Sequence, residues 1–249
     1  SAAPFHFWTP DVYDGSPTVF TSFISTVVKA AGFVAFLRMF HTSFAGGTIS
    51  SHWTLILSLI TAATLVVGNF SAVFQQSVKR MLAYSSIAQA GFMLFAVVAM
   101  NNMGSQGIIL YAAAYTLATV GVFAVLMKLK DYTFEGFNGL ARKQPLLAGA
   151  VAVFMFSLAG IPITAGFFAK YFVLSAAIQH GHLLWLVILA VVCAAISVYY
   201  YFRVIIAMYF KQGEPEVENI SGSFKAAIIL TIALVLLLGM FPNVLLCWL

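Results

Sequence analysis

Two lysines lie in stretches where an apolar chain seldom carries a charge. Lys29 stands near the middle of TSFISTVVKAAGFVAFLRMF, and Lys170 follows a glycine- and proline-containing interruption in LAGIPITAGFFAKYFVL. A lysine at the centre of a membrane helix costs about 2.5–3.5 kcal/mol on insertion scales, so such a residue normally faces a polar cavity or a partner. Because a buried lysine can take up and release a proton, the pair predicts proton transfer.

Each lysine also has a purely structural interpretation. Lys29 could only bridge helices or lie at an interface, and Lys170 could accompany a packing kink near an interface. Ionisable residues inside membrane segments are by default functional, which favours the proton-transfer hypothesis for both. Three hydroxyl residues precede Lys29 on the same helical face and could hold water beside its ammonium group: Ser22, Ser25 and Thr26.

A histidine and several neutral polar residues could extend such a path. His6 lies two residues after Pro4, and an imidazole can relay protons near neutral pH. A lone histidine among aromatic residues can equally be a hydrogen-bonded structural residue. The neutral residues that could continue a hydrated chain, or could instead form helix–helix hydrogen bonds, are Tyr84, Ser85, Ser86, Gln89, Tyr111, Tyr115 and Thr116.

Other chemistries lack their residues in this sequence. It contains no paired-cysteine motif, no glycine-rich phosphate loop and no His-Glu-x-x-His. Cys193 and Cys247 lie in long apolar runs, where packing is a better interpretation than a disulfide, a metal ligand or a nucleophile. No acidic residue lies deep in an expected span. We therefore expect no metal site and no cofactor in this chain, with the proton as the species transferred.

The composition indicates that the elements that position these residues lie in a lipid membrane. Of the 249 residues, 62% are hydrophobic and 8% are charged, and the mean hydropathy is +1.01. Soluble domains carry about 25% charged residues. The net charge of +5 is spread through an apolar chain and forms no basic patch for nucleic acid. The sequence therefore predicts an all-α polytopic membrane protein.

Apolar runs of at least about 20 residues, the length of a spanning helix, predict about seven transmembrane helices. Residues 1–14 are too short to span and contain Pro4 and Pro10, so they predict a half-helix or a re-entrant segment. The runs occupy 18–40, 53–74, 81–100, 106–127, 145–179, 183–210 and 226–249.

The run at 145–179 is too long for one helix. Gly160, Pro162 and Gly166 interrupt it. Proline removes a backbone donor and clashes with the preceding turn, so we expect a helix that is broken near Pro162, close to the bilayer midplane. A broken helix exposes carbonyls and amides, which is tolerated only where they are buried in protein or line a wet cavity. Water should therefore reach Lys170.

Basic residues in the loops indicate the orientation. If successive spans cross the membrane in alternate directions, Arg38 is the only basic residue in the loops of one face. Arg203 lies near the end of a span, where we expect it to snorkel or pair locally. The opposite face should be cytoplasmic or on the mitochondrial-matrix side by the positive-inside rule. It carries eight basic residues: Lys79, Arg80, Lys128, Lys130, Arg142, Lys143, Lys211 and Lys225.

Four segments together resemble the antiporter-like subunit N family of NADH:quinone oxidoreductase, respiratory complex I. They are AAPFHFWTPDVYDGSPT at 2–18, the span that contains Lys29, VKRMLAYSSIAQAGF at 78–92 and LAGIPITAGFFAKYFVL at 158–174. The resemblance covers essentially the whole chain. It implies an antiporter-like fold with two inverted five-helix repeats, each containing a broken helix, and a row of buried charges that conducts protons.

The same resemblance assigns roles by position. Lys29 matches the eighth-helix lysine of the family, Lys170 matches the twelfth-helix lysine, and His6 matches a histidine after the seventh-helix lysine. The first six helices, the fifth-helix glutamate and the seventh-helix lysine have no counterpart. The implied division is a remnant of the first repeat at 1–52, the second repeat at 53–210, and a loop with the last transmembrane helix at 211–249.

This truncated pattern leaves several functions open. The expected function is a non-redox, proton-translocating membrane-arm subunit of the respiratory complex, in the bacterial inner membrane or the mitochondrial inner membrane. NADH, FMN, iron–sulfur clusters and quinone would bind other subunits. The missing N-terminal half, in the same native chain or a separate one, and the other membrane-arm subunits would be partners. The alternatives are a structural or assembly piece without conduction, and a subunit of a related multi-subunit cation/proton antiporter.

Overall fold

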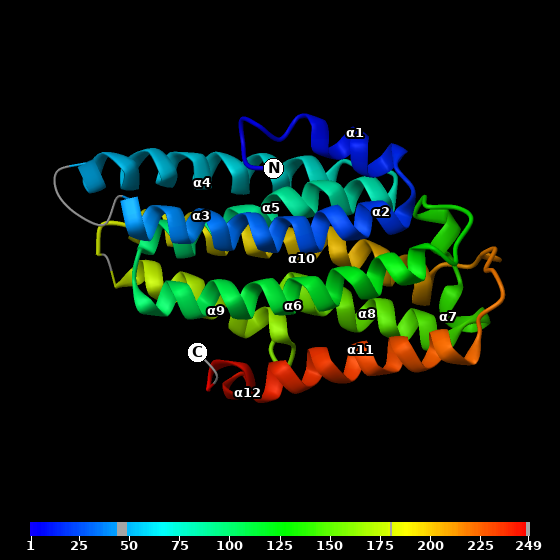
Figure 1. Ribbon diagram of the computed structural model, residues 1–249. Coiled ribbons are helices and arrows are strands. Elements are labelled where there is room, and N and C mark those ends of the chain that lie inside the picture. The colour runs from blue at the N-terminus through cyan, green and yellow to red at the C-terminus, as the bar shows by residue number, and fades with distance from the viewer. Residues whose placement is uncertain (44–48, 180, 248–249) are drawn as a thin grey trace.

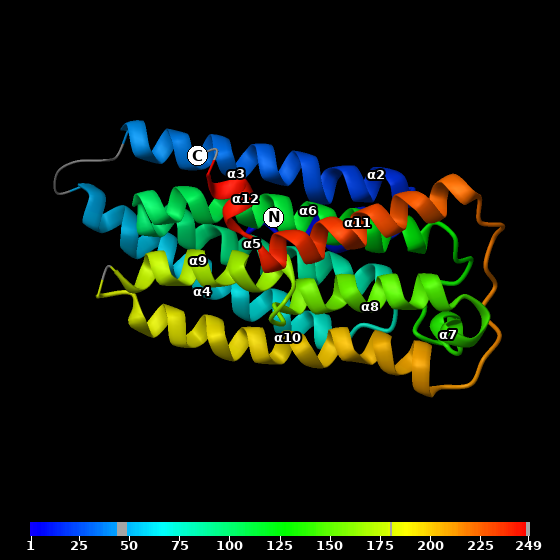
Figure 2. The ribbon, with the colours of Figure 1, turned by 90° about the horizontal axis from the view of Figure 1, so that it is seen from below.

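The helices of this chain run side by side along one direction, as Figures 1 and 2 show from two viewpoints. The structure is a computed structural model that describes residues 1–43, 49–179 and 181–247. Over these ranges no strand forms, and extended backbone pairs only at two isolated bridges, Ser77–Thr133 and Leu129–Val217. The expected all-α membrane fold is confirmed.

The N-terminal half of the chain contains a half-helix and four of the long spans, the first of which is built from α2, η1 and α3. The half-helix begins at Trp8, after a turn, rather than at the first residue. The elements are α1 (Trp8–Gly15), α2 (Thr18–Phe23), the π-helical η1 (Ile24–Val28), α3 (Lys29–Ser43), α4 (Ile49–Val73), α5 (Val78–Ala99) and α6 (Asn102–Leu126).

The C-terminal half contains the broken span and two further long helices. A short 3₁₀ turn and a one-turn helix connect it to α6. The elements are η2 (Glu135–Phe137), α7 (Leu140–Lys143), α8 (Pro145–Ala159), α9 (Ala165–Ile178), α10 (Leu184–Phe210), α11 (Gly222–Met240) and α12 (Asn243–Leu246).

The number of spans agrees with the expectation. In the part of the chain that the structure describes, six helical segments are long and apolar enough to cross a membrane. The shorter apolar helices α8 and α9 follow one another and form the broken span. Residues 44–48, 180 and 248–249 of the expected segments lie outside the described residues. The division at residues 52 and 210 stays a prediction.

The expected end of the last span is wrong. The sequence predicts one helix over 226–249, whereas α11 starts four residues earlier and ends at Met240. Pro242 follows, and it restricts Phe241 to a non-helical conformation with φ −131° and ψ 67°. The hydropathy of the run continues past this point, which is why the apolar pattern alone misses the stop.

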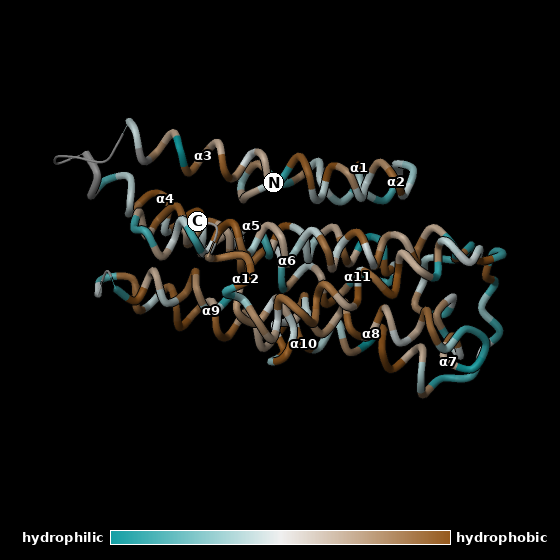
Figure 3. Tube along the Cα trace, turned by 60° about the horizontal axis from the view of Figure 1, so that its bottom comes forward, coloured by the Kyte–Doolittle hydropathy of each residue, from teal (hydrophilic) through white to brown (hydrophobic). Residues whose placement is uncertain are grey.

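Helix α5 is the centre of the bundle. Of its residues only Arg80 and Tyr84 are not buried. The outer spans are far less enclosed. In the most apolar 18-residue stretch of each span, 94% of the residues of α5 are buried, against 22% in the α2–α3 span and 22% in α11. In Figure 3 the helices are mostly brown along their length, and teal residues gather at the end that holds α7 and the α10–α11 loop. A central helix can therefore supply partners to several neighbours.

Candidate functional site

Lys29 is buried between α3, α5 and α6. Its side chain comes from the first residue of α3, and the whole residue is only 8% exposed. The ammonium nitrogen Nζ donates to the Ser86 carbonyl at 2.5 Å and to the Ser86 hydroxyl. It also lies 3.5 Å from the Tyr115 hydroxyl and 5.0 Å from the centroid of that ring. Neutral oxygens and an aromatic face therefore hold its charge.

The helix winds differently just before Lys29. Residues Ile24–Val28 form a π-helical turn between α2 and α3. Ser25 and Thr26 donate their hydroxyls to the Ser22 carbonyl, at 3.1 and 2.6 Å, so these groups satisfy the helix itself. Such turns add a residue per turn and are frequent at functional sites. The sequence predicts these hydroxyls beside the ammonium group but not the π-helical turn, because a local change of winding leaves no hydropathy signal.

Lys170 donates hydrogen bonds to the C-terminal end of α8, the first half of the broken helix. It lies in the second turn of α9 and is 7% exposed. Its Nζ donates to the carbonyls of Leu158 at 3.0 Å and Ala159 at 2.8 Å, and it lies 4.7 Å from the centroid of the Phe92 ring. A cation at the C-terminus of α8 also interacts favourably with the helix dipole.

The break leaves these two carbonyls available. The last turn of α8 ends at Gly160, whose φ of +86° lies in the left-handed region. The amide of Gly160 donates back to the Phe156 and Ser157 carbonyls, and that of Ile161 to Phe156. The carbonyls of Leu158 and Ala159 receive no such backbone donor, so Lys170 supplies it. The break expected near Pro162 is confirmed.

Gln89 of α5 connects this site to a cluster of hydroxyls. Its amide nitrogen donates to the Leu158 carbonyl at 3.0 Å and to the Tyr201 hydroxyl at 3.1 Å, and its oxygen accepts from the Tyr111 hydroxyl. Ser85 and Tyr201 share a hydrogen bond of 2.5 Å. Helices α5, α6, α8 and α10 therefore meet in one polar network beside Lys170.

A small cavity lies between the two lysine sites. Its volume is about 10 Å³, close to the room that one water molecule needs. Tyr115, which contacts Lys29, lies on its wall together with Tyr111, Gln89 and Lys170. A wider cavity of about 310 Å³ also has Lys29 on its wall, with Tyr13 and Trp8. Lys170 lies on the wall of the small cavity, and Lys29 reaches this cavity only through its contact with Tyr115.

Three of the expected path residues have no hydrogen bond, in the described part of the chain, to either lysine or to the network around Gln89: His6, Tyr84 and Thr116. His6 is 8% exposed, stacks on Phe7 at 4.5 Å between ring centroids, and leaves its Nδ1 without a partner. Over the described ranges, no hydrogen bond connects His6 or Tyr84 to Lys29 or Lys170. Tyr84 is one of the two α5 residues that are not buried. Their roles in proton transfer stay predictions.

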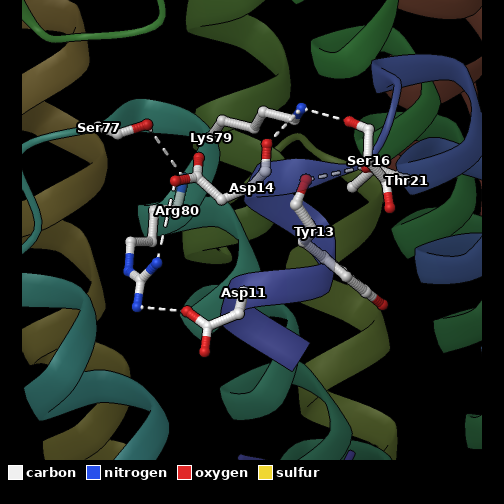
Figure 4. Close-up of polar contacts among 8 residues, drawn as sticks. All are labelled: Asp11, Tyr13, Asp14, Ser16, Thr21, Ser77, Lys79 and Arg80. Atoms are coloured by element: carbon white, nitrogen blue, oxygen red, sulfur yellow. Dashed lines mark hydrogen bonds and ion pairs between the residues drawn. The ribbon is translucent and has the colours of Figure 1, made fainter. Parts of the chain in front are cut away.

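Charge pairs occur elsewhere, at the basic end of the bundle. Figure 4 shows α1 docked on the start of α5: Arg80 reaches Asp11 at 2.8 Å and Asp14 at 3.9 Å. Lys79 donates to the backbone carbonyls of Asp14 at 3.0 Å and Ser16 at 2.7 Å. Both cations indicate the orientation in the sequence, but this docking has no sequence signal, because the partners are more than 60 residues away in the chain.

Arg203 pairs locally at the end of α4. Its guanidinium donates to the carbonyls of Val73 at 2.7 Å and Gln75 at 3.3 Å, and its carbon lies 4.1 Å from the centroid of the Phe134 ring. Among the described residues, the ion pairs involve only Arg80, Lys128 and Lys130, so no carboxylate neutralises either buried lysine. No cluster of three or more metal-binding side chains occurs in this part of the chain either.

Comparison with known proteins gives concordant results. Residues 1–197 match a family described as "NADH:quinone oxidoreductase/Mrp antiporter, TM". The chain is 44% identical to NADH-quinone oxidoreductase subunit N of Trichlorobacter lovleyi, over 99% of this chain and 51% of that protein. It is 41% identical to subunit N 1 of Solibacter usitatus, over 98% and 51%. The chain spans about half the length of the curated relatives it matches.

Solved structures show the same fold. A chain of respiratory complex I from Thermus thermophilus with bound aureothin is similar with a TM-score of 0.86 and 40% identity, over 97% of this chain and 54% of that one. A chain of the Mrp complex from Dietzia is similar with a TM-score of 0.88, over 98% and 54%, at 20% identity. The second likeness concerns the fold alone.

Proposed function

Because the chain belongs to the NADH:quinone oxidoreductase/Mrp antiporter transmembrane family, we propose that it moves protons through the membrane arm of a respiratory NADH:quinone oxidoreductase. Its own role is translocation without redox chemistry. NADH, FMN, the iron–sulfur clusters and quinone bind other subunits, and the neighbouring membrane-arm subunits are its partners. The relatives named subunit N support this assignment.

One observation carries the proposal: two buried lysines have only neutral hydrogen-bond partners, and Tyr115, which contacts Lys29, also lines the small cavity beside Lys170. A carboxylate partner would hold each ammonium group in its charged form, whereas carbonyl and hydroxyl oxygens also accept hydrogen bonds from a neutral amine. Each lysine can therefore change protonation state without losing its position. The hydroxyls of Ser86 and Tyr115 both lie within hydrogen-bond distance of the Lys29 ammonium group, and Tyr115 also lines the small cavity beside Lys170, so a proton leaving Lys29 passes along this side.

A water molecule in the small cavity would connect Tyr115 with Lys170. Tyr115, Tyr111 and Gln89 offer hydroxyl and amide groups around a cavity with room for about one water molecule. Such a water can accept a proton from the Lys29 side and pass another to Lys170. The Gln89 amide holds the Leu158 carbonyl in place through the transfer.

The orientation follows from the basic loops. The end of the bundle with α7 and the α10–α11 loop carries polar residues (Figure 3), including the exposed Lys143, Lys211 and Lys225. The positive-inside rule assigns this end to the cytoplasm or matrix. Lys29 and Lys170 then move protons away from this compartment.

The test removes one lysine from the complete complex at its native length. Lys170→Ala deletes the group that carries the proton, which should slow its transfer step by about 100-fold, the low end for a lost proton-transfer group. We therefore expect proton translocation per NADH oxidised to fall. The measurement is proton uptake by proteoliposomes alongside NADH consumption. Lys225→Ala, an exposed cation of the same kind, is the matched control and should change nothing.

Two outcomes contradict the proposal. If Lys29→Ala and Lys170→Ala complexes both assemble and translocate protons at the normal stoichiometry, the chain is a structural piece of the complex. If the control Lys225→Ala lowers the stoichiometry as much as Lys170→Ala, the loss reflects surface charge and not a proton path.

A further inference from the structure

We propose that the last spanning helix, α11, positions Lys170, and that Gly239 is the positioning residue through which it acts. Gly239 fixes the loop at 160–164, and this loop determines where the two carbonyl acceptors of Lys170 lie. The inference rests on the proposed function, because it concerns the proton carrier of that path. It adds a residue that is 69 positions away from Lys170 in the chain.

The loop between α8 and α9 has a strained backbone. Ile163 adopts φ +79°, a left-handed conformation that a β-branched residue rarely takes because its Cβ crowds the backbone. The side chain gains little packing in return, since it is 65% exposed. Strain of this kind persists only where the surroundings hold the backbone in place. Some neighbouring element must therefore fix this loop.

Helix α11 is the element that lies against it. A Cβ atom at Gly239 would be 2.2 Å from the Ile163 carbonyl oxygen and 2.4 Å from the Thr164 carbonyl carbon. These distances are to backbone atoms, which cannot swing aside as a flexible side chain can. Figures 1 and 2 show the α8–α9 connection beside α11, near the C-terminal end of that helix. Only glycine allows this approach.

The loop in turn connects directly to the lysine site. It starts at Gly160, one residue after Ala159, whose carbonyl accepts from Lys170. Thr164 closes it with a hydroxyl that donates 2.6 Å to the Ile161 carbonyl. The Lys170 stem packs on Gly160, where a Cβ would lie 2.9 Å from the lysine Cδ. Displacing the loop at Ile163 therefore shifts both the carbonyls and the surface on which Lys170 rests.

The test places a methyl group at this contact in the complete complex. We expect Gly239→Ala to lower proton translocation per NADH nearly as much as Lys170→Ala does, while NADH oxidation continues. Gly222→Ala is the control on the same helix: a Cβ at Gly222 meets no atom within 4 Å, so translocation should stay unchanged.

A second comparison separates positioning from a general loss of structure. In a Lys170→Ala background, Gly239→Ala should cause no further loss of stoichiometry, because the residue acts through Lys170. A further loss of similar size would overturn the proposal. An unchanged stoichiometry in Gly239→Ala alone, or an equal loss in Gly222→Ala, would overturn it as well.

Gly239→Ala could also prevent assembly, so a double variant is included. Adding Ile163→Gly lets the loop backbone move away from the new methyl group at low cost. The double variant should assemble and still translocate poorly, because the carbonyls have moved. If it assembles with normal stoichiometry, α11 does not position Lys170. If Lys170→Ala itself has no effect, the proposed function fails and the positioning role with it.

Discussion

At the scale of single residues, both buried lysines are held by backbone carbonyls and hydroxyls. Lys29 uses the oxygens of Ser86, and Lys170 uses the free carbonyls at the end of α8. Hydrogen bonds from a charged donor are worth about 1.5–3 kcal/mol, which is comparable with the insertion cost of about 2.5–3.5 kcal/mol for a lysine at mid-membrane. The free carbonyls at the break in the helix thus offset the cost of placing the Lys170 charge in the membrane.

A residue-scale prediction concerns the strain at Ile163. Ile163→Gly removes a left-handed β-branched residue, a strain of about 1–2 kcal/mol, and loses little packing because the side chain is 65% exposed. We expect the purified complex to withstand a higher temperature of half-inactivation, with unchanged proton translocation. Ile161→Gly is the control; that side chain packs against the core, so this variant should be less stable. A lower stability of Ile163→Gly would contradict the strain argument.

The residues could be chosen from the sequence, but their partners could not. An ionisable residue in an apolar run is visible by inspection, and Lys29, Lys170 and the tyrosines Tyr111 and Tyr115 were found in this way. Their partners lie in other helices, as with Ser86, which is 57 positions from Lys29. Hydropathy shows which runs cross the membrane and does not show how each helix is rotated about its axis. Gly239 gave no signal at all for the same reason.

At the scale of elements, α5 supports the half-helix α1 and both lysine sites. Lys79 and Arg80 at its start hold α1, Ser86 binds Lys29, and Gln89 binds the carbonyl that Lys170 also uses. The two cations at its start differ in burial. Lys79 is 3% exposed as a residue, whereas the side chains of Arg80 and Asp11 are 34% and 73% exposed. Burial should decide which of them matters more for the docking of α1.

The corresponding prediction ranks the two substitutions. Lys79→Ala leaves the carbonyls of Asp14 and Ser16 without their donor, and we expect the docking of α1 to weaken by about 2 kcal/mol. Arg80→Ala breaks an exposed ion pair and should cost about 0.5 kcal/mol. Hydrogen exchange of residues 8–16 in the intact complex measures both. A larger effect for Arg80→Ala would show that the ion pair, and not the buried donor, holds the half-helix.

At the scale of the whole molecule, charge is sorted to one end of the bundle. There two loops are joined by the ion pairs Lys130–Glu216 at 2.9 Å and Lys128–Glu218 at 3.2 Å. The hydrogen bond with Glu216 raises the pKa of Lys130 above its usual 10.5, and the bond with Lys130 lowers the pKa of Glu216 below its usual 4.5. Both groups are exposed, so this link is weak and depends on salt.

These shifts predict where the link is lost. A carboxyl with a lowered pKa contributes stability above its unfolded value near 4.5 and loses it as the pH falls through its folded value. Lysine with a raised pKa loses its contribution only as the pH rises above 10.5. We expect the protection of residues 214–218 against hydrogen exchange, taken relative to the intrinsic rate at each pH, to fall as the pH drops below 4.5. Glu216→Gln should remove this acid dependence, and the control Glu214→Gln should retain it.

The central position of α5 limits where single residues can be inserted into or deleted from this chain. One inserted or deleted residue rotates the following part of a helix by about 100° and shifts it by about 1.5 Å. Between Arg80 and Ser86 such an event would keep α1 docked while turning Ser86 and Gln89 away from their partners. In the two loops that join α6 to α7 and α10 to α11, a change of length outside the paired stretches 128–130 and 216–218 turns no partner of either lysine. Gain or loss of single residues should therefore be confined to those loops, while the spacing from Lys79 to Gln89 stays constant.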